Sequence, residues 1–257
     1  MIGRFRERCR TKSDALLLTL DTRLPQILRI WLVLGGLVVG LRLATAPVAF
    51  ATPSVSSVIF YALLVLAPVA SAILALNWFP NGHILPQPET RLARIGRWRT
   101  VPRSEAENHP LYGTSGIMVS LLVGLLLNVA IRGVEYLASM PPIPAGSPRW
   151  LWVLQLAMSA DVILFGSLYM IAFVAALRRV PLFPRLLAAI WMCDLAMQLV
   201  TAKLVVQAGG LPDGVAGALH TLLDGNVKKT LISVGLWLPY LLLSERVNVT
   251  YRNRLPD

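Results

Sequence analysis

The residues of this chain with the clearest chemical potential are ionisable and amide side chains that lie inside long apolar stretches. They are Asn128, Arg132, Glu135, Asp161, Asp194, Gln198, Lys203 and Lys229. If those stretches cross a bilayer, each buried charge costs at least about 2.5–3.5 kcal/mol on insertion scales. Such side chains need partners, and a polar cluster of this kind can bind an ion or a small polar solute.

Helical spacing groups several of these side chains. Asn128, Arg132 and Glu135 are spaced i, i+4 and i+7, which places them on one stripe of a helix. Asp194 and Gln198 share a stripe on a second helix. The spacing therefore predicts polar faces that point into a helix bundle.

The expected depth of the charges differs along the chain. At about 1.5 Å per residue, Asp161 and Asp194 fall near the membrane midplane. Arg132 and Glu135 fall in the outer part of the span over residues 115–138, and Lys203 falls in the outer part of the span over residues 182–206. Lys229 lies at the outer edge. We expect at least one of the two aspartates to be protonated or bridged by Arg132.

Two interpretations of the charged groups stay open. In the first, they pair with one another and fix the packing of the helices. In the second, they line a polar cavity that opens to the outer face and binds an ion or a small polar solute. The lysines can also extend their ammonium groups to the interface.

The composition places these residues in a membrane protein. The 257 residues are 56% hydrophobic and only 14% charged, whereas a soluble domain carries about 25% charged residues. Apolar stretches long enough to cross about 30 Å of hydrocarbon occur six times. They run over residues 27–46, 55–79, 115–138, 150–177, 182–206 and 227–245. The predicted fold is all-α, a polytopic membrane protein of six transmembrane helices.

Lysine and arginine alternate between rich and poor segments along the chain. Residues 1–26 carry six and residues 80–114 carry five, whereas residues 47–54 and 207–226 carry none. The positive-inside rule then places both termini in the cytoplasm. The net charge of +11 indicates contact with anionic phospholipids at the cytoplasmic face rather than with nucleic acid.

The possible catalytic and metal-binding motifs in the sequence are incomplete. The run Gly113-Thr114-Ser115-Gly116 is similar to the nucleophile motif of rhomboid proteases. A serine nucleophile needs a histidine within hydrogen-bond reach, and none of the six predicted spans contains one. His220 and Asp224 are four apart in a predicted outer loop, and two ligands do not make a metal site. We predict no enzyme, no catalytic residue, no metal and no cofactor.

The end of the chain carries a recognisable pattern. A Trp, a Pro-Tyr pair, a Ser-x-Arg-Val run and an aromatic after a threonine follow one another. They are Trp237, Pro239, Tyr240, Ser244, Arg246, Val247, Thr250 and Tyr251. This pattern resembles the closing signature of the bacterial membrane family called domain of unknown function 2569. The turn Phe183-Pro184-Arg185-Leu186 is similar to a basic turn of that family. The resemblance implies a bacterial cytoplasmic (inner) membrane protein and implies no activity.

The resemblance covers about residues 112–251 and divides the chain. The predicted parts are a basic cytoplasmic segment (1–26), a two-helix membrane unit (27–79), a basic cytoplasmic loop (80–111), a four-helix membrane domain (112–251) and a cytoplasmic tail (252–257). Ser13–Leu24, with Ser13 as its cap, and Arg91–Arg99 are expected either to lie on the membrane or to be solvated loop.

Three functions are open to such a protein. The first is a non-enzymatic accessory or structural subunit that packs against another membrane protein. The alternative is a small solute or ion transporter that uses the Asp161, Asp194 and Arg132 cluster. An enzyme acting on lipid has the least support. A water-accessible cavity at the aspartates favours transport, and aspartates that are buried and paired favour the accessory role.

Overall fold

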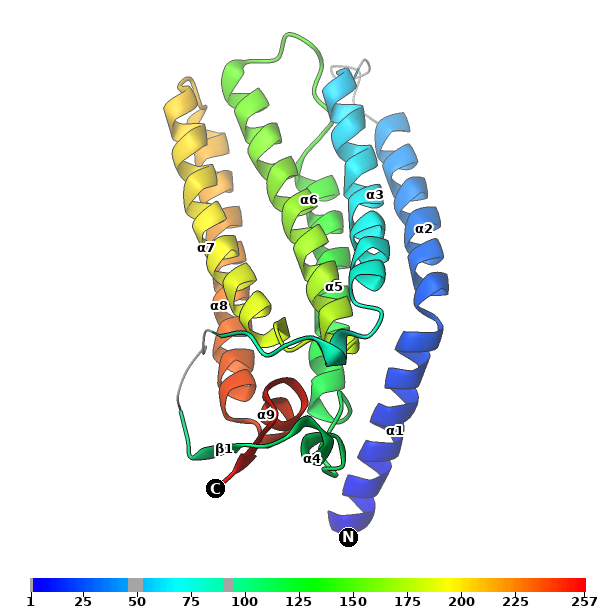
Figure 1. Cartoon of the computed structure of the whole chain (residues 1–257). Helices are drawn as coiled ribbons and strands as arrows, with labels where there is room; N and C mark the ends of the chain where they lie inside the picture. Colours follow the sequence, from blue (N-terminus) through cyan, green and yellow to red (C-terminus); the bar gives the residue numbers. More distant parts are fainter. Residues whose placement is uncertain (1, 46–52, 90–94) are drawn as a thin grey trace.

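The computed structural model describes residues 2–45, 53–89 and 95–257, and nearly all of its regular structure is helical (Figure 1). The long helices are α1 (Ile2–Thr22), α2 (Leu24–Ala44), α3 (Val55–Trp78), α5 (Ile117–Ser139), α6 (Arg149–Leu177), α7 (Phe183–Ala208) and α8 (Asp213–Leu243). The short elements are η2 (Gly82–Ile84), β1 (Trp98–Thr100), α4 (Arg103–Glu107), α9 (Glu245–Arg252) and β2 (Arg254–Pro256). The all-α prediction is confirmed, with one small sheet added at the end of the bundle that carries the termini.

Among the described residues, five helices are long and apolar enough to cross a membrane: α2, α3, α5, α6 and α7. They are compatible with an integral membrane protein that crosses the bilayer several times. The 31-residue α8 is longer than any of them but is not in this group, and its sequence contains Lys228 and Lys229.

Helix α8 begins much earlier than the sequence prediction. The predicted outer loop over residues 207–226 was wrong, because α8 starts at Asp213 and only residues 209–212 separate it from α7. Gly209 and Gly210 have positive φ angles of 71° and 70°, which end α7 in a conformation that favours glycine. Asp213 lies in the first turn of α8, where a negative charge is favourable.

The N-terminal helix also differs from the prediction. Helix α1 spans Ile2–Thr22, so Ser13 lies inside it and is not its cap. Its Oγ instead accepts a hydrogen bond from the Gly116 backbone N–H (3.0 Å) at the start of α5, where helical N–H groups have no partner within the helix. The second predicted surface segment begins at residues 91–94, which lie outside the described residues, and ends in β1.

Helix α6 occupies the middle of the bundle. It packs against α3, α5 and α7, while α2 packs on the outer side of α3 and α8 packs against α7. Its aromatic side chains Phe165, Tyr169 and Phe173 are buried in the main apolar core. Because α3 packs directly on α6, the first two spans are in close contact with the rest of the bundle. The predicted division of the chain into two units stays a prediction.

The C-terminal segment closes one end of the bundle. Strand β2 pairs antiparallel with β1, with Arg99 opposite Leu255. The Tyr251 hydroxyl donates to the Ala176 carbonyl (2.8 Å), and its ring lies 5.1 Å from that of Phe183. Burial raises the pKa of Tyr251 well above its usual value, so this hydroxyl stays protonated and able to donate. The segment therefore ties the last helix to the turn between α6 and α7.

Replacing Tyr251 with phenylalanine is expected to lower the stability by about 0.5–1.5 kcal/mol. The loss is small because the Ala176 carbonyl also accepts from the Arg179 N–H (3.1 Å) and keeps a partner. Thermal unfolding in detergent measures the change. Tyr112→Phe is the matched control, since Tyr112 offers its ring to Arg179 (5.3 Å). A Tyr251→Phe variant as stable as this control would contradict the assigned bond.

Candidate functional site

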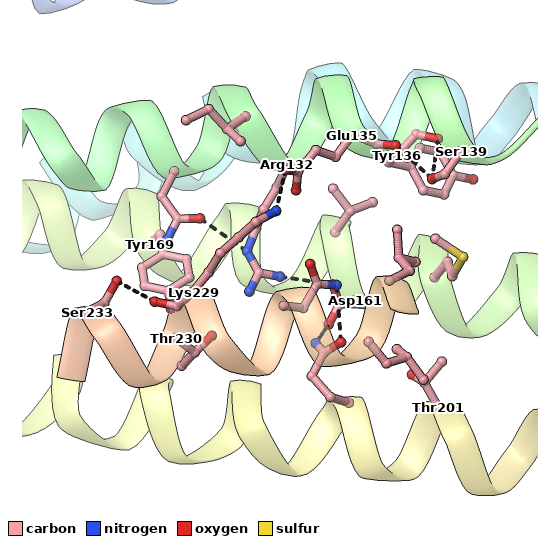
Figure 2. Close-up of a pocket in the computed structure, with 18 of the residues that line it drawn as sticks. Arg132, Glu135, Tyr136, Ser139, Asp161, Tyr169, Thr201, Lys229, Thr230 and Ser233 are labelled. Carbon is pink, nitrogen blue, oxygen red and sulfur yellow. Dashed lines mark hydrogen bonds and ion pairs between the residues drawn. The ribbon is translucent and has the colours of Figure 1, made fainter. Parts of the chain in front are cut away.

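A pocket of about 360 Å³ lies between α5, α6, α7 and α8 (Figure 2). Its polar lining consists of Asn128, Arg132, Glu135, Tyr136, Ser139, Asp161, Tyr169, Gln198, Thr201, Asn226, Lys229, Thr230 and Ser233. Apolar residues complete the wall, among them Leu127, Ile131 and Met158. The volume is at the small end of the range of ligand pockets, about 300–1,000 Å³.

Arg132 of α5 stands at the centre of this lining. Its Nη1 donates to Asp161 Oδ2 on α6 (2.9 Å), and its Nη2 forms a close ion pair with Asp194 Oδ2 on α7. Its Nε donates to Asn128 Oδ1 one turn earlier on α5 (3.2 Å). The guanidinium also lies 5.3 Å from the ring centre of Phe165, a favourable cation–π distance. One side chain thus links three helices through charge-assisted hydrogen bonds.

The two aspartates that share Arg132 have different surroundings. The Asp194 side chain is 0% exposed, and it also accepts from the Tyr169 hydroxyl (2.9 Å) and the Thr230 hydroxyl (3.5 Å). The Asp161 side chain is 15% exposed and lines the pocket, where its Oδ1 accepts from Gln198 Nε2 (2.9 Å). Asp194 therefore anchors the bundle, and Asp161 presents its carboxylate to the cavity.

A second ion pair lies at the mouth of the pocket. Lys229 of α8 pairs with Glu135 of α5, and Figure 2 shows both in front of the Arg132 cluster. Their side chains are 57% and 40% exposed. Two positive groups, Arg132 and Lys229, and two carboxylates, on Glu135 and Asp161, line the pocket. The buried carboxylate of Asp194 lies behind Arg132 and gives the whole cluster an excess of one negative charge.

The structure brings together seven of the eight predicted site residues. The exception is Lys203, which is exposed on α7 and is not among the described residues that line the pocket. Lys229 lies near the middle of α8 rather than at the outer edge of a helix, because α8 begins at Asp213. The expected bridge by Arg132 is confirmed, and it reaches both aspartates.

Sequence reasoning missed several polar residues of the lining. Asn226, Thr230 and Ser233 on α8 are spaced i, i+4 and i+7, the same pattern that singled out the stripe on α5. The prediction of an outer loop over residues 207–226 separated Asn226 from Thr230 and Ser233, so the sequence did not reveal this stripe. Asn226 Nδ2 donates to Gln198 Oε1 (3.3 Å) and thereby joins α8 to the cluster.

The serine motif at residues 113–116 and the His220 and Asp224 pair make ordinary structural contacts. Ser115 Oγ accepts from Arg246 Nη1 (2.8 Å), a contact that ties the start of α5 to α9. His220 and Asp224 lie on α8 and form an exposed contact at 3.5 Å. Within the part of the chain that is described, no group of three or more His, Cys, Asp and Glu residues could hold a metal ion.

Comparisons with protein-family models, with curated proteins and with solved structures found no match for this chain. The chemistry of the pocket is therefore the main ground for a functional assignment. The lining is polar, the cluster that includes the buried Asp194 carries an excess of one negative charge, and the surrounding helices have apolar outer surfaces.

Proposed function

We propose that this chain is a six-span membrane protein that binds a small polar ligand, preferably one with a positive charge, in the pocket between α5 and α8. The main support for ligand binding is that a cavity of about 360 Å³ reaches the partly exposed carboxylate of Asp161. A charged cluster that served packing alone would be expected to close around its ion pairs. The remaining space, beside a cluster whose net charge is negative when the buried Asp194 is included, favours a binding protein such as a small solute or ion transporter.

The path of the chain supports six crossings. The start of α1 and the strand β2 lie at the same end of the molecule (Figure 1), as an even number of crossings requires. The 31 residues of α8 measure about 46 Å along the helix, and α8 returns beside α7 to the end with the termini. The arginine distribution favours a cytoplasmic position for this end, where it can contact anionic phospholipids.

A second candidate function is that of an accessory subunit of another membrane protein. Helix α2 favours it, because only Leu24 and Leu28 of this helix are buried. Several of its other large apolar side chains, including Val33, Leu37 and Leu41, are exposed, and the rest are half-buried. Lipid covers such a surface in a single protein, and a partner helix covers it in a complex.

We further propose that the chain belongs to the bacterial inner-membrane family with the closing signature described above. The signature residues have a shared location that gives the pattern a physical reason. Thr250 Oγ1 accepts from the Gly113 N–H (2.9 Å), Arg246 contacts Ser115, and Tyr251 contacts Ala176. These contacts hold α9 against the start of α5 and the end of α6. A search with an alignment of close relatives of this chain tests the membership.

Cysteine accessibility tests the pocket directly. Ser233 lines the pocket and its neighbour Ile232 is exposed on the apolar surface of α8, so the two sites lie at nearly the same depth. In a background without Cys9 and Cys193, we expect Ser233→Cys in membrane vesicles to react with a membrane-impermeant cationic thiol reagent. We expect Ile232→Cys to stay unmodified, because lipid covers it.

The charge of the reagent provides the second comparison. The net negative charge of the cluster, which includes the buried Asp194, should make the cationic reagent react faster with Ser233→Cys than an anionic reagent of equal size. Equal and slow reaction of both cysteines would mean that the pocket is closed to water, and the accessory function would then be favoured.

A further inference from the structure

We infer that the ligand of this pocket is an amphipathic molecule, a phospholipid with an ammonium group in its headgroup, and that it enters from the bilayer between α5 and α8. This inference rests on the proposed function and specifies the class of ligand and its route. It depends on where the pocket opens and on which side chains surround the opening.

The pocket opens at the side of the bundle. Helix α5 packs against α6, and α8 packs against α7, whereas α5 and α8 are not closely packed over their described lengths. The contact between them at the mouth is the ion pair of Glu135 and Lys229. Both side chains are among the more exposed ones of the pocket lining, so they mark the entrance rather than the floor.

The surface around the entrance is apolar. Ile131 and Val134 on α5 flank Glu135, and Leu231 and Ile232 on α8 follow Lys229, and all four side chains are exposed. Exposed residues of this kind on a membrane helix face lipid. An ion pair that faces hydrocarbon is costly unless further polar groups reach it. A lipid headgroup seated at the mouth would supply those groups.

The charges of the lining select among headgroups. Two carboxylates and two cations line the pocket, and the buried Asp194 behind Arg132 adds a third negative charge, so a headgroup that carries only negative charge is repelled. A zwitterionic headgroup fits better, since its ammonium can pair with Asp161 and Glu135 and its phosphate with Lys229. The apolar part of the wall, which includes Leu127, Ile131 and Leu222, can accept the first carbons of the acyl chains.

Lipid retention measured by native mass spectrometry tests the inference. The purified protein is exposed to equal amounts of phosphatidylethanolamine and phosphatidylglycerol. We expect the first lipid to be retained at least about tenfold better, a factor that corresponds to about 1.4 kcal/mol. The double variant Glu135→Gln/Lys229→Met, which leaves the Arg132 cluster intact, should lose the preference.

Two further variants keep the test decisive. Ser233→Trp fills the pocket from α8 and should also abolish the preference, in case the double variant does not fold. Lys203→Met changes an exposed lysine outside the pocket lining and should keep the preference of the unmodified protein. Equal retention of the two lipids, or a preference that survives both pocket variants, would overturn the inference.

A water-soluble probe separates this inference from the proposed function. Glycerophosphoethanolamine carries the same headgroup without acyl chains, and we expect it to compete only weakly with the lipid. If it bound as well as the lipid, the amphipathic ligand would be refuted, while the binding pocket would stand. If neither bound and Ser233→Cys were also unreactive, the proposed function itself would fail.

Discussion

Replacing Arg132 with methionine is expected to destabilise the folded protein by about 3–5 kcal/mol, the usual cost of removing one partner from a buried ion pair. The guanidinium is the cationic partner of both Asp161 and Asp194. Without it, two carboxylates lie close together in an environment that excludes most water, and they repel each other. A loss of this size can exceed half of the total stability of a domain.

Thermal unfolding in detergent and the yield of folded protein measure this effect. Lys203→Met removes an exposed positive charge from α7 at a site outside the pocket lining, and it should change stability by less than about 0.5 kcal/mol. The variant Arg132→Met/Asp161→Asn/Asp194→Asn should recover much of the loss, because it also removes both carboxylates. An Arg132→Met protein as stable as the lysine control would show that the cluster does not hold the helices together.

The sequence predicted the cluster because charges within apolar stretches are rare and expensive. Six of the eight residues chosen on this ground line one pocket, and a seventh, Asp194, is buried behind it and pairs with Arg132. Helical spacing alone placed Asn128 and Arg132 on one stripe, and the structure joins them by a hydrogen bond (3.2 Å). The same rule included Lys203, whose long side chain stays on the surface of the bundle. The free-energy cost of burying a charge in the membrane identifies residues that need partners. It does not distinguish them from a lysine whose ammonium group reaches the membrane interface.

The start of α8 could not be found by the same reasoning. Residues 213–226 contain Asp213, His220, Asp224 and several glycines, so no apolar stretch marks them as part of a spanning helix. They are nevertheless helical, and Leu219 and Leu223 bury their side chains in a second apolar core. Tertiary packing therefore extends the helix beyond the segment that hydropathy defines.

The distinct roles of the two aspartates were also beyond the sequence. Counting residues along each helix places both aspartates near the membrane midplane, so it predicts the same environment for both. Their difference arises from neighbours on other helices, Tyr169 on α6 and Thr230 on α8, which donate to Asp194. Such contacts depend on how helices rotate and pack against one another, which single-helix spacing does not determine.

This difference leads to a second prediction of large effect. Replacing Asp194 with leucine leaves the buried hydroxyls of Tyr169 and Thr230 without their acceptor. Each orphaned buried group costs about 1–3 kcal/mol, so we expect a loss of roughly 3 kcal/mol. Asp161→Leu should cost less, about 1 kcal/mol, because Arg132 keeps Asp194 and the Gln198 amide can turn to the pocket.

The two substitutions should affect ligand binding in the opposite order, with the larger effect from Asp161→Leu. Asp161 is the member of the pair that faces the cavity, so Asp161→Leu should weaken binding of a cationic ligand by at least about tenfold while the protein still folds. Unfolding in detergent, followed by the lipid retention assay on the folded fraction, measures both quantities on each variant. If Asp161→Leu and Asp194→Leu lowered stability equally and left retention unchanged, the cluster would be a packing device, and the accessory function would account for it better than binding.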